Sequence, residues 1–235
     1  MVQSHPNDEV IRLEGVTKVY RMGEVEVPAL RGVDLVVRRG EFAALAGPSG
    51  SGKTTLLNLI GGLDVPTEGR VLLAGRPLDQ MSGRELSDFR RDHIGFIFQA
   101  YNLIPVLSAY ENVEYVLLLQ RVPEVERRKR VLEILEAVGL KGMEHRRPAQ
   151  LSGGQQQRVA VARAMVTRPD LILADEPTAN LDSATGEALL DMMRSLNQQY
   201  GMTFLFSTHD PMIMERARRL ILLRDGRVVQ DERRG

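Results

Sequence analysis

The sequence has no cysteine, no excess of charge of either sign and no long apolar run. The absence of cysteine excludes disulfides and cysteine-ligated metals, and it fits a reducing compartment. Lys plus Arg and Asp plus Glu both total 31, so the formal net charge of +0 gives no electrostatic reason to expect a nucleic-acid partner. No run approaches the ~18 apolar residues of a membrane-spanning helix, and the first ten residues hold no apolar segment typical of a signal peptide. Any membrane role is therefore expected to come through a partner.

The composition is that of an ordinary globular protein, with 43% hydrophobic and 26% charged residues in 235. Short apolar segments alternate with helical patterns, which predicts an α/β fold with a parallel sheet covered on both faces. The expected strands are 11–20, 33–37, 42–46, 70–73, 94–98, 171–174, 203–207 and 220–223. The first two strands are expected to form an antiparallel β flap, with a hairpin excursion at 21–28.

We expect one domain over 1–235, with an α/β core and β flap formed by 1–98 and 167–235. Residues 99–166 are expected to form an inserted helical subdomain. Ser82 and Ser108 each begin a capping box, and Pro123 is expected to start a helix with apolar positions at 131, 132, 135 and 138. The basic run 127–130 is expected to be solvated, and 231–234 is expected to be a frayed tail.

A glycine-rich stretch between an apolar strand and a helical run dominates the sequence. It reads Gly47-Pro48-Ser49-Gly50-Ser51-Gly52-Lys53-Thr54-Thr55. In such a loop, glycines let successive backbone N–H groups turn toward a phosphate, and the helix start adds its positive dipole end. Lys53 would reach the β- and γ-phosphates, and the Thr54 hydroxyl would complete a Mg²⁺ shell. The stretch therefore predicts a nucleoside triphosphate site.

Polar residues follow two of the predicted strands. Asp175 and Glu176 end an apolar strand, and Pro177 prevents its continuation. Adjacent strand residues point to opposite faces, so Asp175 is a candidate Mg²⁺ ligand and Glu176 a candidate base for an attacking water. His209 lies where the strand 203–207 ends; from its position alone, a surface role and a catalytic role are equally open.

A second small-residue helix start lies at Leu151-Ser152-Gly153-Gly154-Gln155. Its backbone N–H groups and the Ser152 hydroxyl are expected to be free for an anion. The alternative is an N-cap followed by two flexible glycines.

With these motifs in this order, nearly the whole chain resembles the ABC ATPase family. The motifs are the Walker A loop 47–54, the Q-loop glutamine Gln99, the signature 151–155, the Walker B strand 171–175 followed by Glu176, the D-loop 179–182 and the switch histidine His209. The resemblance implies an ATP-hydrolysing enzyme that works with Mg²⁺. It also implies a head-to-tail dimer, of identical or paralogous chains, in which the signature of one protomer contacts the γ-phosphate held by the other.

Residue roles follow from the resemblance. It implies that Glu176 polarises the water, that His209 contacts the γ-phosphate, and that Gln99 joins Thr54 and Asp175 at Mg²⁺. Adenine stacking is assigned to Tyr20, because Phe42 lies in a buried strand. The remaining nucleotide contacts implied are Gly47, Pro48, Ser49, Gly50, Ser51, Gly52, Lys53, Thr55, Ser152, Gly153, Gly154, Gln155 and Asp182.

Stretches 27–33, 61–67 and 98–105 resemble the branch of lipoprotein-releasing, macrolide-efflux and cell-division ATPases (LolD, MacB and FtsE). The resemblance implies an integral membrane permease as partner and a peripheral location on the cytoplasmic side of the membrane. Tyr101, Leu103 and Ile104 would border the groove for that partner, although a buried role is equally open. Two hypotheses remain: the ATPase drives transport, or it signals through a membrane partner to periplasmic enzymes without transporting a substrate. A soluble DNA or ribosome ATPase is disfavoured, because the chain has neither paired ATPase domains nor a long coiled-coil insertion.

Overall fold

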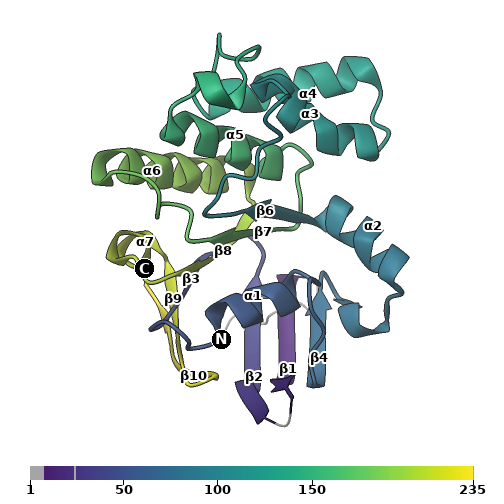
Figure 1. Cartoon of the computed structure of the whole chain (residues 1–235), viewed down its shortest axis with the longest axis vertical. Coiled ribbons are helices and arrows are strands. Elements are labelled where there is room, and N and C mark those ends of the chain that lie inside the picture. Colours follow the sequence, from purple (N-terminus) through teal and green to yellow (C-terminus); the bar gives the residue numbers. More distant parts are fainter. Residues whose placement is uncertain (1–7, 24, 235) are drawn as a thin grey trace.

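The computed structural model describes residues 8–23 and 25–234, which form two sheets and a set of covering helices (Figure 1). The strands are β1 (Glu9–Met22), β2 (Val25–Arg38), β3 (Phe42–Ala46), β4 (Glu68–Leu73), β5 (Arg76–Pro77), β6 (Ile94–Ile97), β7 (Leu171–Asp175), β8 (Thr203–Thr208), β9 (Arg219–Arg224) and β10 (Arg227–Arg233). The helices are α1 (Lys53–Ile60), α2 (Gly83–His93), α3 (Ala109–Leu119), α4 (Glu124–Ala137), α5 (Gly153–Met165), α6 (Ser183–Tyr200) and α7 (Pro211–Arg216). Short 3-10 turns lie at Leu78–Gln80 and Pro148–Gln150.

The central sheet has the strand order β10-β9-β3-β8-β7-β6 and is parallel except for the antiparallel edge strand β10. Its inner strands read as continuous apolar runs because both faces are covered. Ala46 pairs with Thr208, and Asp175 pairs with Ser207. The carboxyl ends of β3, β8 and β7 therefore meet at one edge, and this edge carries the phosphate loop and the polar residues expected to act with it.

Alternate residues of the central strands build two separate cores. Phe42 and Phe204 pack with α3 to α6, whereas Ala43 and Leu205 pack with α1 and the second sheet. The Phe42 ring lies 5.5 Å from that of Phe204 and 4.7 Å from that of Phe206. Such aromatic pairs add about 0.5–1.5 kcal/mol beyond area burial. They join β3 to β8 near the amino ends of the two strands, and the two cores leave α1 and α5 on opposite faces of the sheet (Figure 1).

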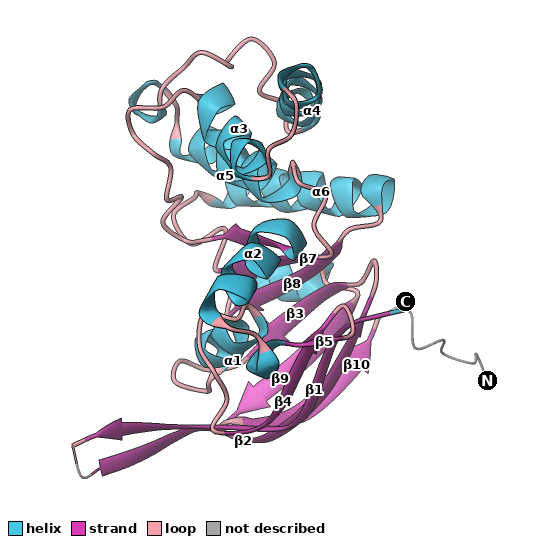
Figure 2. Ribbon diagram, turned by 90° about the vertical axis from the view of Figure 1, so that its right-hand side faces the viewer, coloured by secondary structure: helices cyan, strands magenta, loops and turns pink. Residues whose placement is uncertain are grey.

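The second sheet is antiparallel, with the order β2-β1-β4-β5. β1 and β2 form a long hairpin that extends away from the body (Figure 2). The expected β flap is therefore confirmed, and the excursion at 21–28 is the end of this hairpin. The α/β fold with parallel and antiparallel sheets is also confirmed.

The helices α3, α4 and α5 pack together over one face of the central sheet (Figure 2). Both predicted capping boxes are present, with Ser82 before α2 and Ser108 before α3. On α4, Val131, Leu135 and Val138 are buried as expected, but Leu132 is 38% exposed and Ile134 is buried instead. The buried positions 131, 134, 135 and 138 have the i, i+3, i+4, i+7 spacing of one helix face, and Leu132 lies off that face.

The expectation of a frayed tail at 231–234 is wrong, because β10 continues to Arg233. The guanidinium of Arg219, with its side chain 6% exposed, donates to both carboxylate oxygens of Asp231 and to Glu41. Arg219 holds the pKa of Asp231 below its usual value. A buried arginine therefore needs the tail carboxylate, and this pairing orders the end of the chain.

The first ten residues are expected to hold no targeting segment. Residues 1–7 of this stretch lie outside the described residues. Within 8–23 and 25–234, no helix is both long and apolar enough to cross a membrane.

Candidate nucleotide site

The phosphate loop connects β3 to α1 and leaves its backbone N–H groups without a side-chain cap. Gly52 is the N-cap of α1, with φ +102°, and no side chain caps this helix start. A Cβ on Gly52 would lie 2.7 Å from the Ala29 carbonyl oxygen, and one on Gly47 would clash with that of Leu223. Only glycine fits these two positions, because a Cβ would meet the backbone of β2 or β9; the loop therefore lies directly against both strands as a cradle of uncapped N–H groups.

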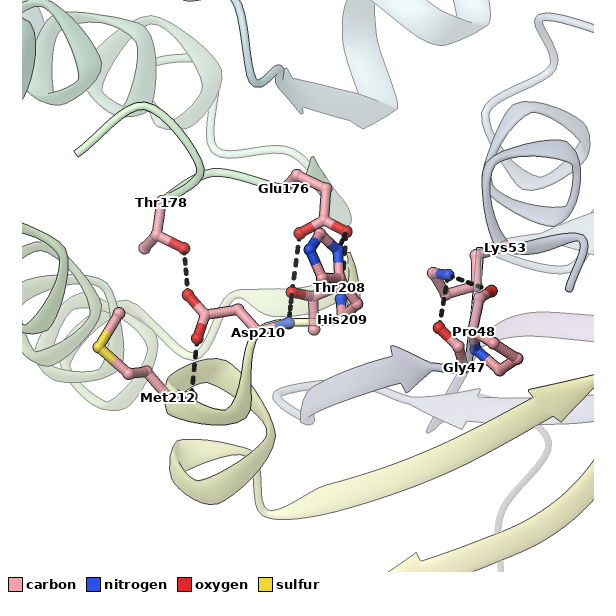
Figure 3. A network of polar contacts seen from close by, with 9 residues as sticks. All are labelled: Gly47, Pro48, Lys53, Glu176, Thr178, Thr208, His209, Asp210 and Met212. Atoms are coloured by element: carbon pink, nitrogen blue, oxygen red, sulfur yellow. Dashed lines mark hydrogen bonds and ion pairs between the residues drawn. The ribbon is translucent and has the colours of Figure 1, made fainter. Parts of the chain in front are cut away.

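Two polar groups of the loop are buried beside this cradle. The Lys53 ammonium donates to the carbonyl oxygens of Gly47 (2.7 Å) and Pro48 (3.0 Å), as Figure 3 shows. The Ser51 hydroxyl is buried and has no hydrogen-bond partner in the described part of the chain. These carbonyl oxygens are neutral acceptors. Charged phosphate oxygens would form stronger hydrogen bonds with the same Lys53 ammonium. The loop therefore fits an anionic group.

Asp175 stands at the end of β7 in a half-buried position. Burial raises the pKa of Asp175, the nearby Glu176 carboxylate adds to this, and Lys53 opposes it. Buried carboxylates are stabilised by a cation, and Mg²⁺ typically takes one or two carboxylates together with phosphates and water. Thr54, at the start of α1, supplies a hydroxyl of the kind that Mg²⁺ prefers. The donor set therefore fits Mg²⁺.

Glu176 follows β7 with the unusual φ of +45° and is fixed by three donors. The Thr208 hydroxyl donates to its Oε2 (3.0 Å), and the His209 backbone N–H donates to its Oε1 (3.1 Å). His209 Nδ1 also lies 2.6 Å from Oε1, so this ring nitrogen carries the hydrogen and donates it. The His209 side chain is 74% exposed, which leaves Nε2 facing solvent. Figure 3 shows this cluster and the phosphate loop side by side at the same end of the sheet.

Tyr20 lies on β1, beside the start of α1. Its hydroxyl donates to Asp64 (2.9 Å), and the Lys18 ammonium lies 4.9 Å from its ring centroid. Burial raises the pKa of Tyr20, while the neighbouring Thr55 opposes this. The residue is 37% exposed, so part of Tyr20 is accessible to solvent.

The second helix start differs from the expectation in one respect. Ser152 is the N-cap of α5, and its hydroxyl accepts the Gln155 N–H (3.3 Å) while Gln155 Oε1 accepts the Ser152 N–H (3.0 Å). The Ser152 oxygen is therefore not free, although its hydroxyl hydrogen still is. A Cβ on Gly153 would lie 2.8 Å from the Tyr101 hydroxyl, and one on Gly154 would lie 2.5 Å from the Thr185 methyl, so these glycines are packed.

Two further candidates lie at element ends. Gln99 follows β6 with an exposed side chain, and its carbonyl accepts from Asn180 (2.9 Å). Asp182 caps α6 by accepting the N–H of Thr185 (3.0 Å) and its hydroxyl (2.7 Å). The Asp182 carboxylate is thus engaged in a helix cap.

A family profile described as "ABC transporter" matches residues 30–179, which hold the phosphate loop, Asp175, Glu176 and the helix start at Ser152. The chain belongs to the ABC transporter family, as an ATP-binding domain. An ABC transporter ATP-binding protein of Thermotoga maritima is 49% identical over 227 residues, which cover 97% of each chain. The macrolide export ATP-binding/permease protein MacB of Brucella melitensis is 48% identical over 222 residues, which cover 94% of this chain and 34% of that one.

Solved structures of the family share this fold. The ATP-binding cassette MJ0796, whose sequence is from Methanocaldococcus jannaschii, forms a dimer bound to ADP and Pi. It matches with a TM-score of 0.86 and 47% identity over 96% of this chain and 99% of that one. The ABC ATPase fold expected from the sequence is confirmed.

Several residues that support the site of this ABC ATPase were not found from the sequence. Thr208 donates to Glu176 and accepts from the Asp210 N–H (2.9 Å), and Thr178 donates to Asp210 (2.8 Å). Gln157 is fully buried and donates to the Pro177 carbonyl (2.8 Å). A polar residue at an inward helical position is the one sequence signal for Gln157.

Proposed function

We propose that this ABC ATP-binding domain hydrolyses Mg·ATP in a head-to-tail dimer and drives a MacB-like membrane partner. One observation carries the proposal. The chain has two helix N-termini whose N–H groups can bind an anion, those of α1 and α5, and the two helices lie on opposite faces of the central sheet (Figure 1). One nucleotide cannot be enclosed by two such starts of the same chain. In the proposal a second protomer supplies the other helix start; that MJ0796 forms a dimer bound to ADP and Pi supports dimerisation.

In the proposed site, Lys53 leaves the carbonyls of Gly47 and Pro48 and binds the β- and γ-phosphates. Thr54, Asp175 and Gln99 hold Mg²⁺, which neutralises phosphate charge and orients the triphosphate. Tyr20 stacks on adenine, a contact worth about 1–3 kcal/mol per base. From the other protomer, the Ser152 hydroxyl and the N–H groups of α5 bind the γ-phosphate.

The chemical step is attack of water on the γ-phosphorus, which breaks its bond to the bridging oxygen and gives ADP and phosphate. Glu176 accepts the proton of that water. Its carboxylate is held in place by Thr208 and His209, so little reorganisation is needed when the water arrives. Because Nδ1–H donates to Glu176, Nε2 can donate to the γ-phosphate only when it carries a second hydrogen, so His209 acts on the phosphate as an imidazolium.

The proposed partner site is a hollow of about 400 Å³ between α2, α3 and α5. Its apolar lining includes Phe96, Phe98 and Leu119, and the two aromatic rings stack 5.7 Å apart. Leu119 is 51% exposed, and Tyr115 and Leu118 of the same helix are also exposed, so α3 presents several apolar side chains to solvent. Of the residues expected at this groove, Leu103 packs against the helical core, so the buried role applies to it. A helix of a membrane permease is the proposed occupant.

The test is Glu176→Gln. Loss of the base should slow ATP turnover by roughly 10²–10⁴-fold while ATP binding stays intact, so that ATP traps a dimer. Turnover is measured by phosphate release and dimerisation by light scattering after size exclusion. Glu215→Gln, an exposed residue on α7, is the control and should behave as wild type. Wild-type turnover in Glu176→Gln would remove Glu176 from the mechanism, and a protein that stays monomeric with ATP would contradict the dimer.

A further inference from the structure

The guanidinium of Arg163 holds the loop that follows β6. Arg163 is in the last turn of α5, and its two terminal nitrogens donate to the carbonyls of Asn102 (2.5 Å) and Tyr101 (3.0 Å). Asn102 has φ +50°, a left-handed conformation that asparagine adopts more readily than most residues, and it turns the chain at this point. The arginine fork is the contact that spans this turn.

Two more carbonyls of the same loop accept side-chain hydrogen bonds. Gln157, also on α5, donates to Phe98 (3.4 Å), and Asn180 donates to Gln99 (2.9 Å). The loop carrying Gln99 is therefore attached to α5 and to the segment before α6, rather than to the strand alone.

The other end of α5 also contacts this loop. The Tyr101 hydroxyl lies where a Cβ on Gly153 would point, 2.8 Å from it. Tyr101 thus contacts the first turn of α5 through its side chain and the last turn through its carbonyl. The helix α5 is therefore attached at both of its ends to the loop that follows β6.

The surroundings of Arg163 favour a role in holding backbone carbonyls over a role as a solvated surface charge. It lines the hollow between α2, α3 and α5, and burial alone lowers its pKa, with no carboxylate of the described chain contributing. A guanidinium can direct two parallel N–H groups at neighbouring carbonyls, whereas a lysine ammonium offers a point charge on a flexible stem. The hydrogen bonds to the two carbonyls are therefore what hold this partly buried cation in place.

Resting on the proposed function, we propose that Arg163 is a positioning residue that fixes the Gln99 loop to α5. Gln99 serves the nucleotide of its own chain, and Ser152 at the start of α5 serves the nucleotide of the partner. The Arg163 fork makes these two groups move together, so it couples the two nucleotide sites. It also lies on the wall of the proposed partner hollow, where an inserted helix would shift α5 and the loop as one body.

The experiment compares Arg163→Lys with the matched control Arg158→Lys. Arg158 is on the same helix and donates to the Val138 carbonyl (2.7 Å), away from the Gln99 loop. For Arg163→Lys we expect turnover to fall about fivefold or more and the Hill coefficient for ATP to fall toward one. ATP affinity of the monomer should change by less than about twofold, because Lys53 and Tyr20 do not contact Arg163. Arg158→Lys should retain turnover and cooperativity.

A second measurement needs no ATP. Amide hydrogen exchange at 99–103 in the nucleotide-free protein should be faster in Arg163→Lys and unchanged in Arg158→Lys. Unchanged exchange, or wild-type turnover and cooperativity in Arg163→Lys, would overturn the role of Arg163. An equal loss of turnover in both variants would also overturn it. Absence of turnover in the wild-type protein would instead overturn the proposed function.

Discussion

The starts of α1 and α5 both offer backbone N–H groups to an anion, but they are built differently. Gly52 at the start of α1 provides no side-chain cap, whereas Ser152 and Gln155 form a full capping box on α5. At an uncapped start, the backbone N–H groups of the first helical turn can donate to a ligand bound by the same chain. Without that ligand, these N–H groups have no acceptor in the helix. A capped start keeps its shape in the absence of ligand, which suits the proposed contact of α5 with a partner's nucleotide.

The capping box of α5 also differs from those of α2 and α3. There the third helical position is Glu85 or Glu111, and the same position of α5 is the neutral Gln155. A carboxylate would oppose the positive end of the helix dipole that attracts an anion. Glutamine provides the same cap geometry without a negative charge.

The largest expected effect concerns α1. Lys53→Ala removes the one ammonium that neutralises the phosphates, and a hydrogen bond to a charged group is worth about 1.5–3 kcal/mol. We expect ATP affinity to fall by roughly 10–100-fold, measured by titration calorimetry. The fold should survive, since Lys53 contacts only carbonyls of its own loop. Unchanged affinity would contradict the assignment of this loop to the triphosphate.

The next effect concerns α5. Ser152→Ala should lower the free energy of unfolding by about 0.5–2 kcal/mol through loss of the cap, and it should also abolish ATP-dependent dimerisation. Ser82→Ala removes the same kind of cap from α2 and should cost similar stability while leaving dimerisation intact. Chemical denaturation and light scattering check the two effects separately. Equal behaviour of both variants would mean that Ser152 is only a cap.

A third test concerns Asp175, the carboxylate proposed to hold a cation beside α1. Asp175→Asn removes a half-buried carboxylate whose pKa is raised above 3.8, so the nucleotide-free protein should melt a few degrees higher at pH 7. In the wild type, ionisation of this carboxyl is less favourable in the folded state, and stability falls as pH rises through the folded pKa. The difference in Tm between the two proteins should therefore shrink as pH is lowered toward about 4. A difference independent of pH would contradict this explanation.

The smallest expected effect tests the neutral cap. Gln155→Glu should keep the α5 cap and the Tm, but it should weaken ATP-dependent dimerisation by about 2–5-fold, as one dipole-opposing charge costs about 0.3–1 kcal/mol. The effect should decrease at high salt. Tighter dimerisation in Gln155→Glu would contradict the explanation that Gln155 is neutral in order to leave the start of α5 attractive to an anion.

Much of the architecture was predictable because it depends on residues close together in sequence. The phosphate loop, both capping boxes and the apolar strands follow from patterns spanning a few residues. For Ser152 the sequence left two roles open, an anion ligand and an N-cap, and the structure shows the N-cap. The tail 231–234 was expected to fray because its charge pattern gives no sign of Arg219, which lies on another strand.

The sequence by itself determined where this protein can bind phosphate, because glycines, a lysine and a helix start act through local backbone geometry. Only the tertiary structure decided how those groups are arranged. It put α1 and α5 on opposite faces of one sheet, joined His209 to Glu176 and fixed the Gln99 loop to α5 through Arg163. These contacts join residues far apart in the chain, so the packing of the two cores sets them.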